Sequence, residues 1–534
     1  MQTHGGKVWA YVYDSGIREV EEIAAKAYAK YMNENALDFT VFPSLLQMEN
    51  DIVAIVADMF APATDDTGTA PTHLPAGTFT SGGTESILLA VKAARDWARE
   101  TKPQVTRPEI ILPVTAHAAF HKAAHYLGLK PVVVPVNAQT FRVEANTVRQ
   151  HITPNTVMLV GSAVNYSHGV TDPIDELGTI AIEHGLWLHV DACIGGFLMH
   201  YLRRLGERIP DFDFSVPGVS SLSVDLHKYA YAAKGASVVL YRDKQLRQYE
   251  MFASTRWAGY PMINTTIQST KSGGPLAACW AVMHYLGDDG YLRLAQKTLY
   301  ARDKLVSGLT SFPYLRVLGT PEAGLISFTS DSVDVFILAD EMKRRGWYVQ
   351  VQPGRPNTDK MPGLEPNLHL TVTGASEAIV DPFVANLEAA IQDVQHHMAE
   401  AEAQAKGDAD VAEAESQAEA DSAANRSAIP PEVALQLATI DATTLTPELQ
   451  SQLLLGLGLT PGQLPGDMAD INRLLRILPS DLTERLFIAI ASDMYTPTHH
   501  SSHTQSHNPG HTPSDDSSQS QRTPQADVLR GPIS

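Results

Sequence analysis

Short apolar runs alternate with stretches of helical spacing along much of the chain, and this alternation constrains the fold more than any other feature. Runs of this length are typical of buried strands, and the helical stretches between them are what βαβ units require. The runs occupy residues 109–113, 131–136, 157–164, 186–191 and 237–241. They predict an α/β fold with a mainly parallel sheet. A second α+β segment is predicted from about residue 314, with strands at 325–329 and 369–372.

Lys228 stands between two predicted buried segments, in the sequence Ser-Val-Asp-Leu-His-Lys-Tyr-Ala-Tyr of residues 223–231. An apolar run precedes it, and a small-residue turn and another apolar run follow. A lysine in this position is poorly solvated, and desolvation favours the neutral amine, which can form a Schiff base. The alternative is a solvated lysine at a strand end, which is the commoner arrangement.

Asp191 ends another apolar run. The carboxyl end of a strand is where open α/β sheets bind their ligands. A carboxylate there could face the ring nitrogen of pyridoxal phosphate, keep that nitrogen protonated and make the ring an electron sink. The alternative is an aspartate that only caps the following turn.

Residues 80–86, Thr-Ser-Gly-Gly-Thr-Glu-Ser, open a stretch of helical spacing. Gly82, Gly83 and Thr84 would leave backbone N–H groups free at the helix start, where a phosphate can bind. An ordinary turn followed by a cap is the alternative. The segment is neither an ATPase phosphate loop nor a dinucleotide fingerprint, because it lacks the Gly-Lys-Ser/Thr ending of the first and the third glycine of the second.

His117 offers a flat imidazole that could stack on a pyridine ring. His117, His121 and His125 share one helix face, which raises the possibility of a metal site. We do not favour a metal, because no carboxylate or cysteine joins them and zinc sites usually recruit more than one segment. The order along the chain, a phosphate loop followed by His117, Asp191 and Lys228, indicates a pyridoxal-phosphate enzyme.

The chain resembles the pyridoxal-phosphate-dependent group II decarboxylase superfamily and, within it, the sphingosine-1-phosphate lyase branch. The likeness covers roughly residues 7–395 and returns near 480–497. Cys193 and the Tyr-Ala-Tyr after Lys228 resemble the lyases more than the amino-acid decarboxylases. The matching segments are 41–44, 80–86, 116–124, 168–173, 189–197, 227–231, 234–235, 273–274 and 277–280. The resemblance implies a fold-type I, aspartate aminotransferase-like large domain, a small α+β C-terminal domain, and pyridoxal 5'-phosphate as cofactor.

The resemblance also implies residue roles. For the cofactor these are Lys228 forming the Schiff base, His227 beside the phosphate, Asp191 pairing with the pyridinium, His117 stacking on the ring, and Gly82, Gly83 and Thr84 holding the phosphate. Gly273 and Gly274 would approach the phosphate from the neighbouring subunit, because such sites are shared across a homodimer. Tyr166 and Lys234 would lie near the substrate and act on its phosphate or in proton transfer. The alternatives are a packing role for Tyr166 and a solvated Lys234.

Three departures from the lyase pattern fall around the substrate. Asp38 stands where the lyases have a histidine that could meet a substrate phosphate, and a carboxylate there would repel that group. Lys271 replaces an arginine and so loses a bidentate fork, and Arg256 replaces an acid. The segments implied for the cofactor are intact, whereas those implied for the substrate are altered.

The function implied by the resemblance is carbon–carbon bond cleavage. A β-hydroxy (phospho)amine would be split by retro-aldol chemistry into an aldehyde and a small amine such as phosphoethanolamine, with Tyr166 or Lys234 handling protons. The alternative is an L-amino-acid decarboxylase using the same cofactor. An alternative of another class is a non-catalytic scaffold built on this fold, against which the intact Lys228 and Asp191 argue.

Charge and cysteine content bound the partners. A net charge of −20 and a pI near 5.4 argue against nucleic acid and anionic membranes, and leave a small-molecule amine as the expected ligand. Cys193 and Cys279 are too few for a disulfide framework, so a reducing cytoplasm is expected. No basic segment followed by an apolar stretch opens the chain and no apolar run reaches 18 residues, so we expect no membrane anchor.

Composition changes along the chain predict six segments. Residues 399–424 contain almost no large apolar side chain and predict an exposed helix or a disordered linker, and the final stretch is too polar to fold alone. The predicted segments are an N-terminal arm with helices at 1–60, a cofactor-binding large domain at 61–310, a small domain at 311–397, an acidic linker at 398–428, a helical extension at 429–496, and a His-, Ser- and Pro-rich tail at 497–534.

Overall fold

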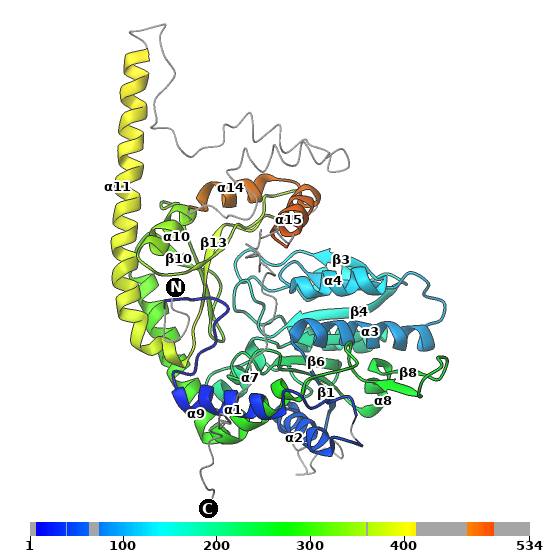
Figure 1. Cartoon of the computed structure of the whole chain (residues 1–534). Helices are drawn as coiled ribbons and strands as arrows, with labels where there is room; N and C mark the ends of the chain where they lie inside the picture. Colours follow the sequence, from blue (N-terminus) through cyan, green and yellow to red (C-terminus); the bar gives the residue numbers. More distant parts are fainter. Residues whose placement is uncertain (1–6, 39, 63–73, 359–360, 413–466, 496–534) are drawn as a thin grey trace, which may run out of the picture.

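A computed structural model describes residues 7–38, 40–62, 74–358, 361–412 and 467–495 of the chain (Figure 1). The predicted tail lies outside the described residues, as do most of the predicted acidic linker and the first part of the predicted helical extension. Within the described part, no helix is both long enough and apolar enough to cross a membrane.

A seven-stranded sheet forms the centre of the large domain. Its order is β1-β7-β6-β5-β4-β2-β3, and all neighbours are parallel except the two pairs made by β7. The predicted α/β fold with a mainly parallel sheet is confirmed. The strands are β1 (Ala76–Thr80), β2 (Glu109–Pro113), β3 (Lys130–Val134), β4 (Thr156–Ser162), β5 (Trp187–Asp191), β6 (Val219–Asp225) and β7 (Ser237–Tyr241).

Helices cover both faces of this sheet, which explains why its central strands are apolar throughout rather than alternating. On one face α3 and α4 pack through a cluster that includes Ile87 and Phe120; the other face packs against α2, α6, α7 and α9. The helices of this domain are α1 (Arg18–Tyr31), α2 (Pro43–Phe60), α3 (Gly83–Thr101), α4 (Ala118–Leu127), α5 (Ala145–His151), α6 (Ile174–His184), α7 (Gly195–Arg204) and α8 (Lys244–Arg247), with the short η1 (Gln248–Glu250) and the hairpin of β8 (Phe252–Ser254) and β9 (Met262–Asn264).

Helix α9 (Gly273–Thr310), which is interrupted by non-helical backbone at Gly287, leads from the large domain into the small one. The small domain has a four-stranded antiparallel sheet in the order β10-β11-β13-β12 and its own core, which includes Phe328 and Phe383. Its elements are β10 (Leu315–Val317), β11 (Leu325–Ser330), α10 (Val335–Arg344), β12 (Gln350–Gln352), β13 (Asn367–Thr371), η2 (Gly374–Ile379) and α11 (Val380–Ala412). Helix α11 continues into the predicted linker, so the described part of that linker is helical.

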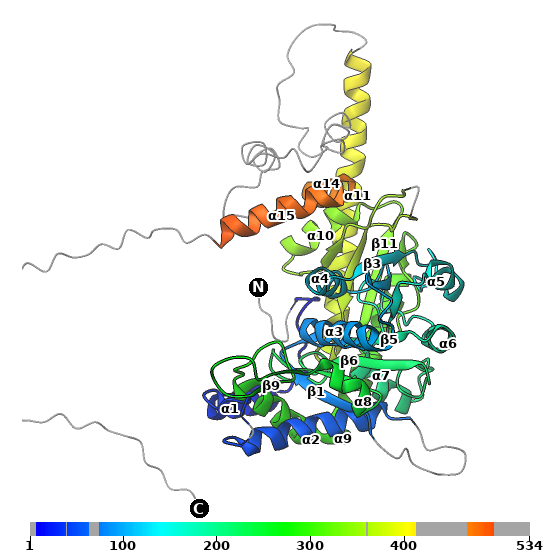
Figure 2. The same ribbon diagram turned by 90° about the vertical axis from the view of Figure 1, so that its right-hand side faces the viewer.

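Two C-terminal helices, α14 (Ala469–Ile477) and α15 (Ser480–Met494), lie over the small domain, and α15 reaches above α4 of the large domain (Figures 1 and 2). The start of α14 is held by Asp340, whose carboxylate accepts hydrogen bonds from the backbone N–H groups of Met468 and Ala469. Arg473 adds an ion pair to Asp334 of 2.7 Å. These contacts connect the C-terminal helices to α10.

Candidate active site

The carboxyl ends of β5 and β6 and the loop after β1 meet at a cavity of about 340 Å³. This is the edge at which open α/β sheets bind ligands, and the volume lies within the range of small-molecule sites, roughly 300–1,000 Å³. The cavity is lined by Ser81, Gly82, Gly83, Thr84, Glu85, Ile87, His117, Ser162, Val164, Tyr166, Asp191, Cys193, Ile194, Asp225, His227 and Lys228. Eight of the eleven residues predicted for the site are therefore gathered here.

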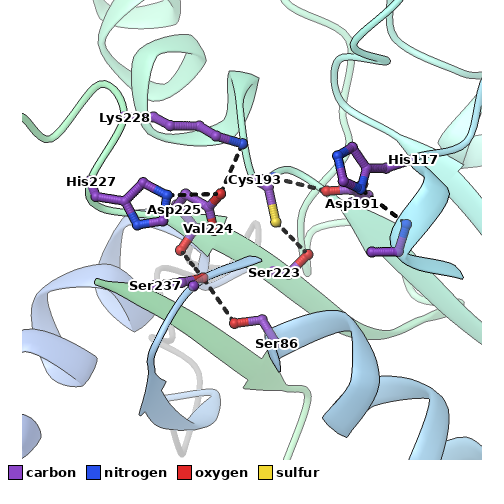
Figure 3. Close-up of polar contacts among 12 residues, drawn as sticks. Ser86, His117, Asp191, Cys193, Ser223, Val224, Asp225, His227, Lys228 and Ser237 are labelled. Carbon is purple, nitrogen blue, oxygen red and sulfur yellow. Dashed lines mark hydrogen bonds and ion pairs between the residues drawn. The ribbon is translucent and has the colours of Figure 1, made fainter. Parts of the chain in front are cut away.

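Lys228 is ion-paired in the cavity wall. Its Nζ lies 2.8 Å from Oδ2 of Asp225, and the side chains are 17% and 3% exposed (Figure 3). Burial alone would lower the pKa of Lys228, but the charge of Asp225 outweighs burial and raises this pKa above its usual value. The same pairing, with a contribution from His227, lowers the pKa of Asp225 against the effect of its burial. The neutral amine expected from desolvation is thus wrong for the chain by itself, because the neighbouring carboxylate holds the lysine as a cation.

Gly83 begins α3 directly against the end of β6. A Cβ at this position would lie 2.7 Å from both carboxylate oxygens of Asp225 and 2.9 Å from Sγ of Cys193, closer than such atoms approach. A side chain at this position would therefore displace the Asp225 carboxylate, the Cys193 sulfur or the start of α3. The N–H groups of the first turn of a helix lack intrahelical partners, and Gly82, Gly83 and Thr84 line the cavity at this point.

His117 and Asp191 lie close together on the far side of the cavity from Lys228 (Figure 3). His117 is the N-cap of α4, and its Nδ1 accepts a hydrogen bond of 3.2 Å from the backbone N–H of Ala119, which fixes the ring. Asp191 accepts a hydrogen bond of 3.1 Å from the backbone N–H of Cys193. No group of three metal-ligating side chains occurs among the described residues.

A buried polar chain runs behind Asp191. His189, two residues earlier on the same face of β5, contacts Ser221 Oγ at 2.8 Å through Nδ1 and Ser223 Oγ at 3.2 Å through Nε2. Ser223 also accepts a hydrogen bond from the Cys193 thiol at 3.2 Å. Burial lowers the pKa of His189 to about 4 and raises the pKa of Cys193, so both side chains are neutral at pH 7.

Tyr166 connects the cavity to the small domain. Its hydroxyl donates to Oε1 of Gln350, and its ring stacks on His369 with centroids 4.5 Å apart. Gln350 in turn donates from Nε2 to the hydroxyl of Tyr11 at 2.6 Å. Burial raises the pKa of Tyr166, so the phenol keeps its proton at Oη. Tyr13 of the same N-terminal arm lies nearby, with its pKa raised to about 12, mainly by burial.

The other three predicted residues, Lys234, Gly273 and Gly274, do not line the cavity. The ammonium of Lys234 donates to the carbonyl of His227 at 3.2 Å and lies 5.0 Å from the ring centre of Tyr13. Gly273 and Gly274 begin α9, where a Cβ on Gly273 would lie 3.0 Å from the carbonyl oxygen of Tyr31. Their predicted approach from a second subunit stays a prediction, because one chain does not test it.

Several residues in or next to the cavity were not predicted from the sequence. Asp225 stands three residues before Lys228, and a turn after a strand can bring residues at this separation together. The ion pair of Asp225 with Lys228 could therefore have been predicted from their spacing. His189 was accessible in the same way, because residues i and i+2 of a strand share a face. Tyr11, Tyr13 and Gln350 come from segments distant in sequence, and no local pattern signals their contacts.

The residues present fit pyridoxal phosphate. The start of α3 is kept open by Gly83, Oδ1 of Asp225 is buried with no hydrogen-bond partner among the described residues, and a lysine, a carboxylate and an imidazole face one cavity. A fold of this type with these groups defines the class of pyridoxal-phosphate-dependent enzymes.

The chain belongs to the family described as "Pyridoxal-dependent decarboxylase conserved domain", whose model matches residues 4–330. A second model, "Pyridoxal-dependent enzyme, C-terminal putative HTH domain", matches residues 431–492. The predicted family, cofactor and enzyme class are confirmed: the chain is a pyridoxal-phosphate-dependent lyase.

Relatives place the chain within this family. It is 38% identical over 392 residues to the sphingosine-1-phosphate lyase of Arabidopsis thaliana, covering 73% of this chain and 69% of the relative. The corresponding enzyme of Saccharomyces cerevisiae is 36% identical, covering 73% and 63%. The solved structure of a sphingosine-1-phosphate lyase from Burkholderia pseudomallei superimposes with a TM-score of 0.68 at 36% identity, covering 76% of this chain and 90% of that one. The chain is thus similar to the lyase branch.

Proposed function

We propose that this enzyme cleaves the carbon–carbon bond between the amine-bearing and hydroxyl-bearing carbons of a phosphorylated long-chain β-hydroxy amine. The products would be a long-chain aldehyde and a small phosphorylated amine such as phosphoethanolamine. The observation that carries the proposal is the gathering of Lys228, Asp191, His117 and Tyr166 around one cavity in a chain 36–38% identical to several sphingosine-1-phosphate lyases. Those proteins act on the substrate that their names state.

The cofactor contacts in this proposal are those that the family resemblance implies, and the residues that would make them line the cavity. Lys228 holds the aldehyde, Asp191 keeps the proton on the ring nitrogen, and His117 stacks on the ring. Gly82, Gly83, Thr84 and His227 hold the phosphate. When bound, pyridoxal phosphate draws electrons from the amine-bearing carbon of a substrate. The buried Cys193 and the chain of Ser223 and His189 exclude water from the side of the cavity behind Asp191.

Tyr166 is our candidate for contacting the substrate hydroxyl, because it lines the cavity and Lys234 does not. The phenol carries its proton at Oη and directs it to Gln350, so an oxygen lone pair of Tyr166 is free to orient the substrate hydroxyl. Lys234 is placed for a supporting role, since desolvation and the charge of Lys228 lower its pKa. Replacing Tyr166 by Phe removes this acceptor and should lower kcat about tenfold or more, the size of one lost hydrogen bond, while cofactor absorbance stays unchanged.

A homodimer is the second part of the proposal. Large apolar side chains stand exposed on the β8–β9 region and beside the start of α2. They are Val41, Phe252, Trp257, Tyr260, Ile263 and Ile267, each more than half exposed. A second copy covering them could bring Gly273 and Gly274 toward its partner's cofactor phosphate. Sedimentation of the full chain at micromolar concentration tests this: a dimer supports the proposal, and a monomer with full activity contradicts it.

An L-amino-acid decarboxylase is the second candidate. The chain is 33% identical to a probable L-tyrosine/L-aspartate decarboxylase of Methanothermobacter thermautotrophicus, with 62% of this chain and 87% of that protein's length aligned. Asp38, in place of a phosphate-binding histidine, also favours it. We further propose that the enzyme works in a reducing cytoplasm, since Cys193 and Cys279 are both free and buried.

One experiment separates these functions. The visible spectrum of the purified enzyme should show a cofactor band near about 410–430 nm that disappears in Lys228→Ala. Aldehyde release from a phosphorylated sphingoid base supports the lyase, whereas carbon dioxide release from amino acids alone supports the decarboxylase. If a phenotype of the chain persists unchanged in Lys228→Ala, a scaffold role replaces both.

A further inference from the structure

A second cavity, of about 730 Å³, adjoins the catalytic cavity, and Tyr166 lines both. Its walls come from three separate parts of the chain: residues 166–168 of the large domain, β12 with the segment that follows it in the small domain, and residues 475–480 at the junction of α14 and α15. Both views show α14 and α15 lying over the small domain, with α15 above α4 of the large domain (Figures 1 and 2). The volume is about twice that of the catalytic cavity and suits a ligand of some size.

The charge of this second cavity is distinctive. Its lining contains two guanidinium groups, Arg355 and Arg476, and no aspartate or glutamate. Neither arginine has a carboxylate partner among the described residues; Arg355 contacts Sδ of Met361 at 3.1 Å. Both side chains are half-buried. In a chain of net charge −20, two unpaired cations in an acid-free recess are complementary to an anion.

Two buried polar atoms in the lining residues also lack partners. Oδ1 of Asn367 and Nδ1 of His168 make no hydrogen bond within the described part of the protein, and each residue is only 2% exposed. Buried polar atoms of this kind are usually satisfied. Neither atom is itself a contact for an anion, because both are closed off from solvent and Oδ1 of Asn367 can only accept a hydrogen bond; they mark this wall of the cavity as polar.

We propose that this second cavity binds an oxyanion carried by the amine substrate, with Arg355 and Arg476 as its ligands and Tyr166 at the junction with the reacting atoms. The inference rests on the proposed function for the identity of the substrate. It does not depend on Asp38, which is exposed and lines neither of these two cavities. A phosphate monoester and a carboxylate share the required chemistry.

The test uses ligands that have no amine and so do not depend on turnover. Binding of dodecyl phosphate, dodecanoate and dodecanol to the holoenzyme is measured by calorimetry for the wild type, Arg355→Gln, Arg476→Gln and the double variant. Arg485→Gln, an exposed position on α15 outside the cavity lining, is the matched control. Each cavity substitution should raise the Kd of the phosphate about tenfold or more, the size of a charge-assisted hydrogen bond, and the control should leave it unchanged.

Comparison of the two dodecyl anions shows whether the cavity recognises a phosphate or a carboxylate. If only dodecyl phosphate loses affinity, the cavity recognises a phosphate; if both anions lose affinity equally, it accepts a carboxylate as well. Equal Kd values for wild type and double variant overturn the inference. The cofactor band reports folding of each variant, and Arg476→Lys, which keeps the charge, should retain part of the affinity if Arg476→Gln does not fold.

Steady-state kinetics separate this inference from the proposed function. With a phosphorylated long-chain base as substrate, the double variant should raise KM at least about tenfold while kcat changes little. Cleavage with an unchanged KM leaves the lyase function standing and overturns the cavity. If dodecyl phosphate binds in an arginine-dependent way but no substrate is cleaved, the cavity inference stands and the lyase function is overturned.

Discussion

At the scale of single residues, the pair of Lys228 and Asp225 sets the state of the amine before any cofactor arrives. A buried lysine alone would lose its proton readily, yet the carboxylate 2.8 Å away reverses the direction of the pKa shift. The prediction from sequence that Lys228 is poorly solvated was sound, whereas the conclusion that it is neutral was not. The error arose because burial was weighed without the charge that the turn brings beside it.

Asp225→Asn should therefore let Lys228 react at lower pH. Because the raised lysine pKa leaves the amine neutral only in alkaline solution, removing the carboxylate should move the midpoint of cofactor incorporation into apoprotein downward by about one pH unit or more, a tenfold change in the neutral fraction. Stopped-flow absorbance across pH 6–10 measures this. Asp211→Asn, which removes a largely exposed partner of Arg203, is the control. An unchanged midpoint in a folded Asp225→Asn protein would contradict the pairing.

At the scale of elements, the strands of the large sheet could be predicted from the sequence, whereas the contacts between the large and small domains could not. Runs such as 109–113 and 237–241 indicate strands, because a strand that is buried on both faces is apolar throughout and lacks the polar alternation of a surface strand. The order of Gly83, His117, Asp191 and Lys228 indicated one site because each follows or begins an element at the same sheet edge. Gln350 contacts Tyr166 across 184 residues, and contacts of that range leave no mark in local sequence.

Gly83→Ala tests the junction of α3 with β6. The added methyl would meet the Asp225 carboxylate and the Cys193 sulfur, so either these side chains or the first turn of α3 must shift. We expect cofactor affinity to fall about tenfold or more, in line with the loss of one or two charge-assisted hydrogen bonds, measured by titration of the apoprotein. Gly128→Ala is the control: its Cβ meets nothing, so its positive φ should cost about 1 kcal/mol of stability and no cofactor affinity.

At the scale of the whole molecule, three buried histidines make the fold sensitive to acid. Burial lowers the pKa of His168 and His189 to about 4 and that of His369 to about 3. In the unfolded chain these histidines have pKa values near 6.5. Between about pH 4 and pH 6.5 the unfolded chain therefore binds more protons than the folded chain. Their contribution to stability is intact above about pH 6.5 and is lost as pH falls toward 4, for His189 by about 3 kcal/mol.

Denaturant unfolding between pH 7.5 and 5 should accordingly show stability falling with pH, and His189→Gln should reduce the slope by up to about 1.4 kcal/mol per pH unit. His125→Gln, at an exposed position on α4, should leave the slope as it is. If His189→Gln and wild type have parallel profiles, His189 is protonated in the folded protein and its position in the buried polar chain is misjudged.

The catalytic cavity is assembled from two kinds of parts. The groups around Lys228 and Asp191 come from successive strand ends of one sheet, whereas the groups around Tyr166 come from the N-terminal arm, the small domain and the large domain together. Changes of sequence along that meeting line can alter which amine is accepted while the strand ends keep their spacing. Members of the family can therefore diverge in substrate while the residues at the strand ends stay the same. Engineering this enzyme for a different amine should begin at Gln350 rather than at Lys228.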